Sequence, residues 1–181
     1  MFQNKSAPKG FTLVELIVVI TIIGILAITL VPKIISAPRS ARDSAREASL
    51  EEIRIALEVY NSENLDYPDS GSGWVCLNSS SSVYNALVDG GYISGMPTDP
   101  LTGNNVLGCA DGSFRYLSLV KSLTPNQAFI LAAEVEMGNK ANVGWDDIKN
   151  FDNESNVTDV LNDIETTTTI NGDAAYVIWG D

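Results

Sequence analysis

The sequence predicts an α+β fold, in which one long amino-terminal helix packs against a small antiparallel sheet. Three observations support this prediction. Residues 11–31 form an almost uninterrupted apolar run. Apolar residues then recur at helical spacing within residues 39–61. In the second half of the chain, short stretches alternate with the period of two that is typical of β-strands.

The apolar run, FTLVELIVVITIIGILAITLV, contains one ionisable side chain, Glu15. A continuous helix of this length rises about 31 Å, which matches the hydrocarbon core of a bilayer. The run therefore predicts a membrane-spanning helix. A carboxylate in lipid costs on the order of 3 kcal/mol and is usually functional. Glu15 is thus a candidate functional residue, and the alternative is a carboxylate that reaches water at the membrane surface.

The residues that precede the run are few, polar and basic. Residues 1–10 include two lysines and end in Gly10, which is followed by Phe11 and, four residues later, by Glu15. This pattern resembles the prepilin signature of type IV pilins and of the pseudopilins of type II secretion systems. The fold it implies is pilin-like.

The resemblance also implies a processing step and an assembly contact. Residues 1–10 would be a leader that a prepilin peptidase removes on the cytoplasmic face, between Gly10 and Phe11, and the new terminal amine would be methylated. The carboxylate of Glu15 would pair with the terminal amine of a neighbouring subunit inside a filament. Such a pairing is physically reasonable, because a buried carboxylate gains most from a fixed cation in a low dielectric.

Charge and length limit the possible partners of the remaining chain and the number of domains that it can form. Loss of the two leader lysines changes the formal net charge from −12 to −14, and acidic residues dominate beyond Arg54. Nucleic acid is a poor partner for such a surface. What remains of the 181 residues has room for one compact head domain. The resemblance and the cysteines place this head outside the cytoplasm, on a chain of the bacterial inner membrane that enters a periplasmic or cell-surface filament.

Two prolines follow the apolar run. Pro32 and Pro38 each remove a backbone donor, so residues 32–38 are expected to be kinked or locally unwound. From Arg39 the helix is expected to resume, with an apolar stripe that packs under the head rather than forming a binding groove. The stripe consists of Leu50, Ile53, Leu57 and Tyr60. The predicted organisation is a leader (1–10), a transmembrane or filament-core helix (11–31), its kinked continuation (32–62) and an acidic head (63–181).

The first part of the head is rich in turn residues. Within residues 64–91 a short helix is expected, capped by Ser82 and ended by Gly90-Gly91. Residues 92–103 are expected to form irregular chain with a turn anchored by proline. The order of a Tyr-Pro pair, a short helix and a Pro-x-Asp-Pro segment resembles the major pseudopilins.

The strands are expected in the second part of the head. Residues 113–120 and 129–136 alternate as half-buried strands do, and they are expected to pair antiparallel across a loop at Pro125. Residues 174–179 predict a third strand. A helix is expected at residues 158–165 as a carboxy-terminal elaboration.

No catalytic site is indicated. The chain has no histidine, which is the commonest general base, and it lacks phosphate-binding and nucleophile motifs. Glu134 and Glu136 are interpreted as a solvated strand face rather than an acid and base pair. Cys76 and Cys109 lack zinc spacing, and in an exported head they favour a disulfide over two buried free thiols.

A calcium site is suggested near the end of the chain. Residues 145–152, WDDIKNFD, resemble a segment of the major pseudopilins in which a loop binds calcium. The resemblance implies Asp146 and Asp147 as ligands, with Asp152 as a third, and calcium does prefer hard oxygen ligands. A solvated acidic turn remains open as the alternative.

The predicted function is assembly. Copies of this chain and related pilin-like subunits would stack their apolar helices into a filament, with the prepilin peptidase and the inner-membrane assembly machinery as further partners. The middle and the tail resemble the major pseudopilin, which implies a type II secretion pseudopilus that supports protein export. Two alternatives remain open: a major or minor subunit of a type IV pilus that serves adhesion, motility or DNA uptake, and an uncleaved membrane-anchored binding protein.

Overall fold

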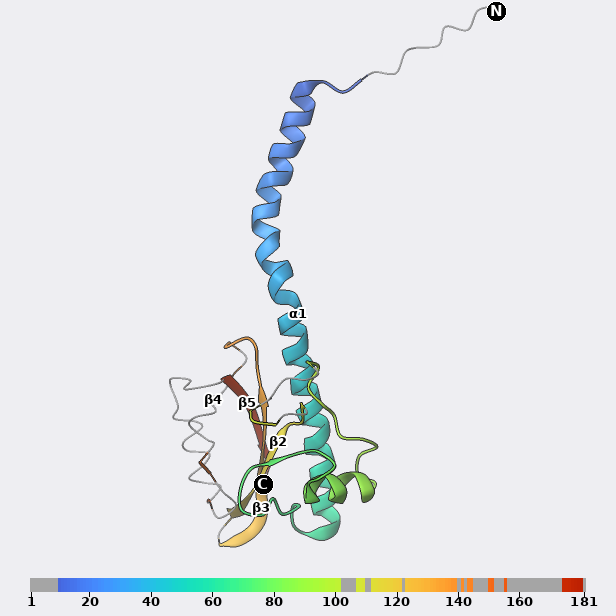
Figure 1. Cartoon of the computed structure of the whole chain (residues 1–181), viewed down its shortest axis with the longest axis vertical. Helices are drawn as coiled ribbons and strands as arrows, with labels where there is room; N and C mark the ends of the chain where they lie inside the picture. Colours follow the sequence, from blue (N-terminus) through green and yellow to red (C-terminus); the bar gives the residue numbers. More distant parts are fainter. Residues whose placement is uncertain are drawn as a thin grey trace, which may run out of the picture. The chain divides into compact units, whose positions relative to one another are not determined.

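The structure is a computed structural model that describes residues 10–101, 107–109, 112–121, 123–139, 141, 143–144, 150–151, 155 and 174–180. The chain divides into two compact units, residues 1–38 and residues 39–181. Its elements are helix α1 (Leu13–Asn64), strand β1 (Val75–Cys76), helix α2 (Ser82–Tyr84), π-helix η1 (Asn85–Asp89), and strands β2 (Arg115–Lys121), β3 (Thr124–Glu134), β4 (Val143–Gly144) and β5 (Ala174–Gly180) (Figure 1).

Helix α1 is continuous from Leu13 to Asn64. Pro32 and Pro38 both lie within it. The prediction that the helix could unwind locally at these prolines was therefore wrong. A proline removes a single backbone donor, and the hydrogen bonds of the residues around it continue the helix on both sides. The kink at these two residues stays a prediction.

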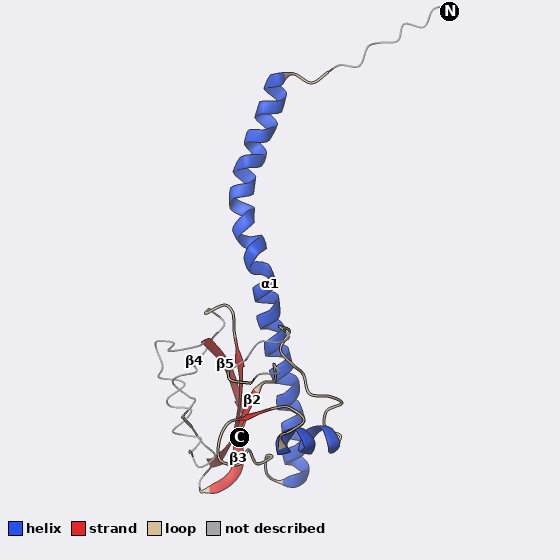
Figure 2. Cartoon of the chain, viewed as in Figure 1, coloured by secondary structure: helices blue, strands red, loops and turns tan. Residues whose placement is uncertain are grey.

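The strands form one antiparallel sheet with the order β1-β2-β3-β5-β4. Figure 2 shows the second half of α1 beside this sheet. The predicted pairing of β2 with β3 is confirmed, with Tyr116 opposite Leu131. The prediction that the connecting loop lies at Pro125 was wrong, because Lys121 already pairs with Thr124. Pro125 therefore lies inside β3, near the exposed start of the strand, where a missing donor is tolerated.

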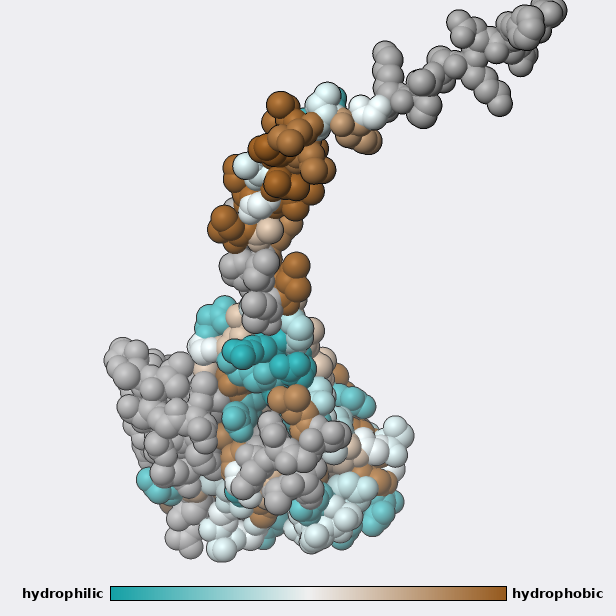
Figure 3. Space-filling view, turned by 45° about the horizontal axis from the view of Figure 1, so that its top comes forward, coloured by the Kyte–Doolittle hydropathy of each residue, from teal (hydrophilic) through white to brown (hydrophobic). Residues whose placement is uncertain are grey.

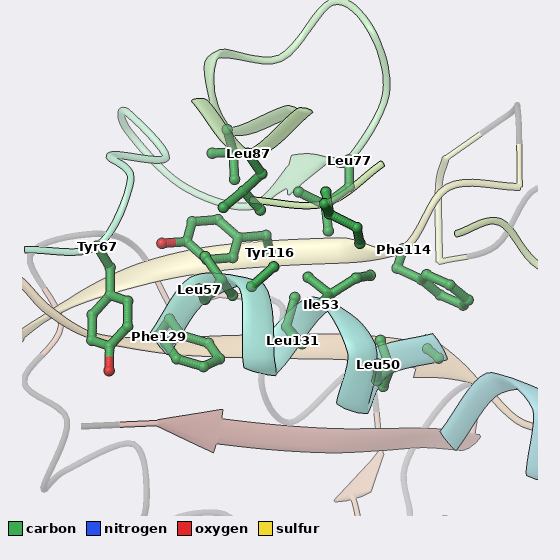
Figure 4. Packing of buried hydrophobic residues seen from close by; sticks show 14 residues of the cluster. Leu50, Ile53, Leu57, Tyr67, Leu77, Leu87, Phe114, Tyr116, Phe129 and Leu131 are labelled. Carbon is green, nitrogen blue, oxygen red and sulfur yellow. The ribbon is translucent and has the colours of Figure 1, made fainter. Parts of the chain in front are cut away.

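The main core lies between α1 and one face of the sheet. Leu50, Ile53 and Leu57 have no exposed surface, and they pack with side chains of β2 and β3 (Figure 4). The ring of Tyr67 meets that of Phe129 edge to face, with centroids 4.7 Å apart. The predicted apolar stripe of α1 is confirmed as a core surface.

A second core covers the other face of the same strands. Its buried members are Leu107, Leu117, Leu119, Ala128, Ile130, Ala132 and Val177. Trp74, Phe151 and Trp179 pack against it. Strands β2 and β3 are therefore buried on both faces, and the expectation of half-buried strands was wrong. The reason is that the second face of each strand is also apolar, through residues such as Leu117 and Ile130.

The short helix of the head begins one residue earlier than expected. The hydroxyl of Ser81, rather than that of Ser82, accepts a hydrogen bond from the backbone of Tyr84. The helix continues as the π-turn η1 and ends at Gly90, as predicted. The helix expected at residues 158–165 lies outside the described residues.

Candidate functional site

The two residues at the expected cleavage point precede helix α1. Gly10 and Phe11 lie before its first residue, Leu13, and the Phe11 side chain is 94% exposed. Behind them, Thr12 and Glu15 cap the helix reciprocally. The backbone and the hydroxyl of Thr12 each donate to Glu15 Oε2 at 2.8 Å, and the backbone of Glu15 donates to the Thr12 hydroxyl at 3.2 Å. In the single chain, the Glu15 carboxylate therefore serves as half of a capping box.

The helix turns that follow expose apolar side chains in every direction. Between residues 13 and 30, the large hydrophobic residues are 49% to 76% exposed, and hydrophobic residues make up most of this stretch on the face that Figure 3 shows. The hydroxyl of Thr21 is turned inward and donates to the carbonyl of Ile17 at 2.5 Å. Among the helix residues that the structure describes, no stretch meets the length and hydropathy of a membrane span. The membrane span over residues 11–31 stays a prediction.

A cluster of charged side chains joins the second half of α1 to the head. We call it the charge cluster; it consists of Arg42, Asp43, Arg46, Asp99 and Glu136. At its centre, Arg46 is 2% exposed and forms a two-pronged pair with Asp99, at 2.5 and 2.9 Å. The same guanidinium donates to Asp43 at 2.6 Å and to Glu136 at 3.1 Å.

The other members of the charge cluster complete its contacts. Arg42 donates to both carboxylate oxygens of Glu136, at 2.6 and 2.5 Å. Asp43, which is fully buried, accepts from the backbone of Glu136 and of Met137 at 3.0 Å each. Because Asp43 binds residues two and three positions beyond the last residue of β3, the cluster holds α1 against the chain that leaves that strand.

Asp99 fastens a second segment to the same point of α1. This residue lies in the Pro-x-Asp-Pro segment and is 2% exposed. Its carboxylate accepts from the backbone of Leu101 at 2.8 Å, and its own backbone donates to the carbonyl of Gly112 at 2.8 Å. The motif aspartate thus holds its own loop in shape while it binds Arg46.

The contacts of the charge cluster favour the charged forms of Glu136 and Arg46. The hydrogen bond from Arg42 is the main cause that lowers the pKa of Glu136 to about 2. For Arg46, burial opposes the charge, but the bonds and charges of Asp99, Asp43 and Glu136 outweigh it and raise the pKa. Each buried charge in the cluster is paired, which is the condition under which buried ions are tolerated.

The sequence did not predict this cluster. Glu136 was interpreted as part of a solvated strand face, and that interpretation was wrong, since its side chain is 22% exposed and is bound by two arginines. A signal was present, because Asp43 and Arg46 are at i−7 and i−4 from Leu50 and so share the apolar face of the helix. Opposite charges at i and i+3 on a core-facing stripe indicate a buried ion pair.

The two cysteines form the predicted disulfide. The Sγ atoms of Cys76 and Cys109 are 2.08 Å apart and the Cα atoms 5.8 Å apart, across 33 residues of sequence. Cys109 is 1% exposed. The bond ties strand β1 to the segment that precedes β2.

The predicted calcium ligands cannot be placed, because Asp146, Asp147 and Asp152 lie outside the described residues. Within the described residues, no group of three or more metal-binding side chains comes together. Calcium binding therefore stays a prediction from the sequence.

The sequence is similar to two protein families and to several known proteins. Residues 5–31 match the prokaryotic N-terminal methylation motif, and residues 33–114 match the family of type II secretion system protein G. The type II secretion system core protein G of Pseudomonas aeruginosa is 31% identical over 157 residues, which cover 83% of this chain and all of that protein. The protein of the same name from Aeromonas hydrophila is 29% identical over 152 residues, which cover 82% of this chain and 99% of that protein.

A pilus protein is also similar, over a shorter stretch. The type IV wide pilus major component PilA4 of Thermus thermophilus is 36% identical over 77 residues, which cover 42% of this chain and 59% of that protein. The match to the Pseudomonas protein extends over the whole of that relative and includes the head. Together with the long helix and the antiparallel sheet, these findings show that the chain belongs to the protein G family of type II secretion systems, the major pseudopilins, which are structural subunits and not enzymes.

Proposed function

We propose that this chain is the repeating subunit of a type II secretion pseudopilus and that it supports protein export. The observation that carries the proposal is the start of α1, which exposes apolar side chains all round and holds one carboxylate, Glu15. A helix that is apolar on every side needs a cover. Lipid of the inner membrane supplies that cover before assembly, and the helices of other copies supply it afterwards, with the head outside the cytoplasm.

Processing prepares the contact that Glu15 makes in the filament. Cleavage between Gly10 and Phe11 by the prepilin peptidase creates a terminal amine, which is then methylated. In the single chain Glu15 bonds to Thr12, a neutral partner. The amine of a neighbouring copy is charged, and charge-assisted hydrogen bonds are roughly twice as strong as neutral ones. Glu15 therefore gains by exchanging its partner as the subunit enters the filament through the inner-membrane assembly machinery.

The experiment combines mass analysis with imaging in the native host. Wild-type protein is expected to begin at Phe11, with the mass of a methylated amine, and to form thin fibres in negative stain. Gly10→Val keeps the leader and abolishes fibres. Glu15→Ala is processed and inserted normally but forms few fibres, because the neighbour's amine loses its partner. An unshortened wild-type chain, or normal fibres from Glu15→Ala, contradicts the proposal.

A type IV pilus subunit is the second candidate, and the similarity to the Thermus pilus component favours it. The two functions differ in their dependence on the secretion machinery. Deletion of the gene for this chain should stop export of secreted proteins if it forms a pseudopilus, and should remove surface pili or twitching motility if it forms a pilus. An uncleaved, membrane-anchored binding protein, the third possibility, would keep residues 1–10.

Calcium binding by the acidic turn is a finer part of this proposal. It rests on the resemblance of residues 145–152 alone. A ligand that binds only the folded state stabilises it by mass action, by roughly 3 kcal/mol at a hundredfold excess over Kd. The melting temperature of the chain should therefore rise at millimolar calcium, and Asp147→Ala should remove the increase. An equal melting temperature with and without calcium leaves the solvated acidic turn as the correct interpretation.

A further inference from the structure

The segment that carries Cys109 has an unusual backbone. Leu107 and Gly108, the two residues before this cysteine, both have a left-handed conformation, with φ of 47° and 87°. This conformation is costly for leucine, which has a side chain, and is free of that cost for glycine. A strained residue of this kind persists only where its surroundings hold it in place. The segment therefore needs contacts that fix its backbone.

Arg115 of β2 supplies such contacts. Its Nε donates to the carbonyl of Leu107 at 2.8 Å, and its Nη1 donates to the carbonyl of Trp74 at 3.4 Å. In the sheet, Arg115 also lies opposite Cys76. One guanidinium thus joins residues 107–109 to the residues around the other cysteine. We call these contacts the arginine clasp; it consists of Arg115, Trp74 and Leu107.

The arginine clasp is closely fitted and partly shielded from water. A Cβ atom on Gly108 would lie 2.6 Å from Arg115 Nη2, so a side chain at this position would displace the guanidinium. Burial lowers the pKa of Arg115, and hydrogen bonds are electrostatically stronger where water is excluded. Leu107 is 3% exposed and packs in the second core. The clasp is therefore a non-covalent joint at the same place as the disulfide.

We propose that Arg115 is a positioning residue for the disulfide, which holds residues 107–109 against β1 while Cys76 and Cys109 are still thiols. In the bond-forming reaction, the thiolate of one cysteine attacks a sulfur of an oxidised reagent such as glutathione disulfide, and one glutathione thiolate leaves. The thiolate of the second cysteine then attacks the mixed disulfide, and a second glutathione thiolate leaves as the bond forms. Two cysteine thiols are oxidised and one glutathione disulfide is reduced. Proximity of the two cysteines favours the second step.

The equilibrium of the disulfide with glutathione tests the positioning role. The detergent-solubilised chain is incubated in mixtures of reduced and oxidised glutathione, and its oxidised fraction gives the effective concentration of one cysteine at the other. Arg115→Met keeps an apolar stem but has no donor. It should lower the effective concentration by roughly tenfold, because hydrogen bonds from a charged donor contribute at least about that factor. An effective concentration equal to that of the wild type overturns the proposal.

Two control variants separate positioning from charge and from overall stability. Arg54→Met removes the same charge from exposed ion pairs on α1, and it should leave the effective concentration unchanged. Leu57→Ala weakens the main core and lies outside the arginine clasp. It should also leave the value unchanged under conditions in which tryptophan fluorescence shows a folded head. A fall in either control equal to that of Arg115→Met contradicts the positioning role.

Gly108 gives an independent test of the same contact. Gly108→Ala should displace the guanidinium and lower the effective concentration, whereas Gly91→Ala should not. Gly91 also has a left-handed backbone, with φ of 80°, but a Cβ atom there would meet nothing within 4 Å. In a chain that already carries Arg115→Met, Gly108→Ala should have a smaller effect, because the Nη2 atom that it meets is absent. An equal effect of Gly108→Ala in the two chains would mean that backbone strain alone acts, and it overturns the role of Arg115.

Discussion

The two halves of α1 have the same secondary structure but differ in what covers them. In the first half, the large apolar side chains are at least 49% exposed. In the second half, Leu50, Ile53 and Leu57 are fully buried, and two charged residues on the same face, Asp43 and Arg46, are at most 2% exposed. The second half is stabilised by contacts within its own chain. The first half exposes its apolar side chains in the single chain, and we propose that other molecules cover them, so only the second half should respond to changes in the fold of the head.

The largest effect on folding is expected from the centre of the charge cluster. Arg46→Ala leaves Asp43 and Asp99 as uncompensated buried charges, and loss of one partner of a buried ion pair costs about 3 to 5 kcal/mol. The free energy of unfolding of the detergent-solubilised chain, measured in urea, should fall by this amount. Arg54→Ala is the matched control, because its partners are exposed and it should cost less than about 1 kcal/mol. An equal fall in the free energy of unfolding for the two variants would show that the charge cluster does not stabilise the packing of α1 on the head.

A pair of apolar substitutions compares the two halves of α1 directly. Leu57→Ala should lower the free energy of unfolding by about 2 to 5 kcal/mol, because it leaves a cavity in a closed core. Ile23→Ala, at a position that is 59% exposed, should change it by less than about 0.5 kcal/mol while reducing fibre yield. A destabilised monomer from Ile23→Ala would mean that the first half also has partners inside its chain.

The smallest expected effect is a loss of folding stability at acid pH. The pKa of Glu136 is lowered to about 2 in the folded chain, so its pairing stabilises the fold fully above its usual pKa of about 4.3 and loses this effect as the pH falls towards 2. The loss should be about 1 to 2 kcal/mol, since the side chain is partly exposed and solvent weakens the pair. Unfolding in urea between pH 5 and pH 2.5 measures it. Glu136→Gln should flatten the curve over that window, and an unchanged curve contradicts the assignment.

The sequence predicted those features that one element carries alone. The apolar stripe of α1 and the strand at residues 174–179 follow from periodicity within single segments, and both were correct. The disulfide was also correct. The charge cluster was missed, because its members come from three segments that only the folded chain brings together. A local pattern exists for the i,i+3 pair of Asp43 and Arg46 alone, and none indicates that Asp99 and Glu136 join it.

The strand burial was missed for a related reason. Ser118 and Phe129 lie on one face of the sheet, and their apolar neighbours in the sequence lie on the opposite face, which is also buried. Alternation with a period of two cannot show that other residues cover this second face. Trp74 and Phe151, which supply part of that layer, lie in segments with no strand or helix signal. Loop residues that cover a sheet are therefore the part of this fold that sequence patterns predict least well.

The spacing of the charge cluster along the chain sets an order of events during folding. Arg46 reaches Asp99 across 53 residues, and Arg42 and Asp43 reach residues 136 and 137 across 93 to 94 residues. Contacts between such distant positions form only after the intervening chain is available. The contacts of Asp43 with residues 136 and 137 therefore form only after the chain has been made as far as residue 137, so a chain truncated before that point lacks the charge cluster.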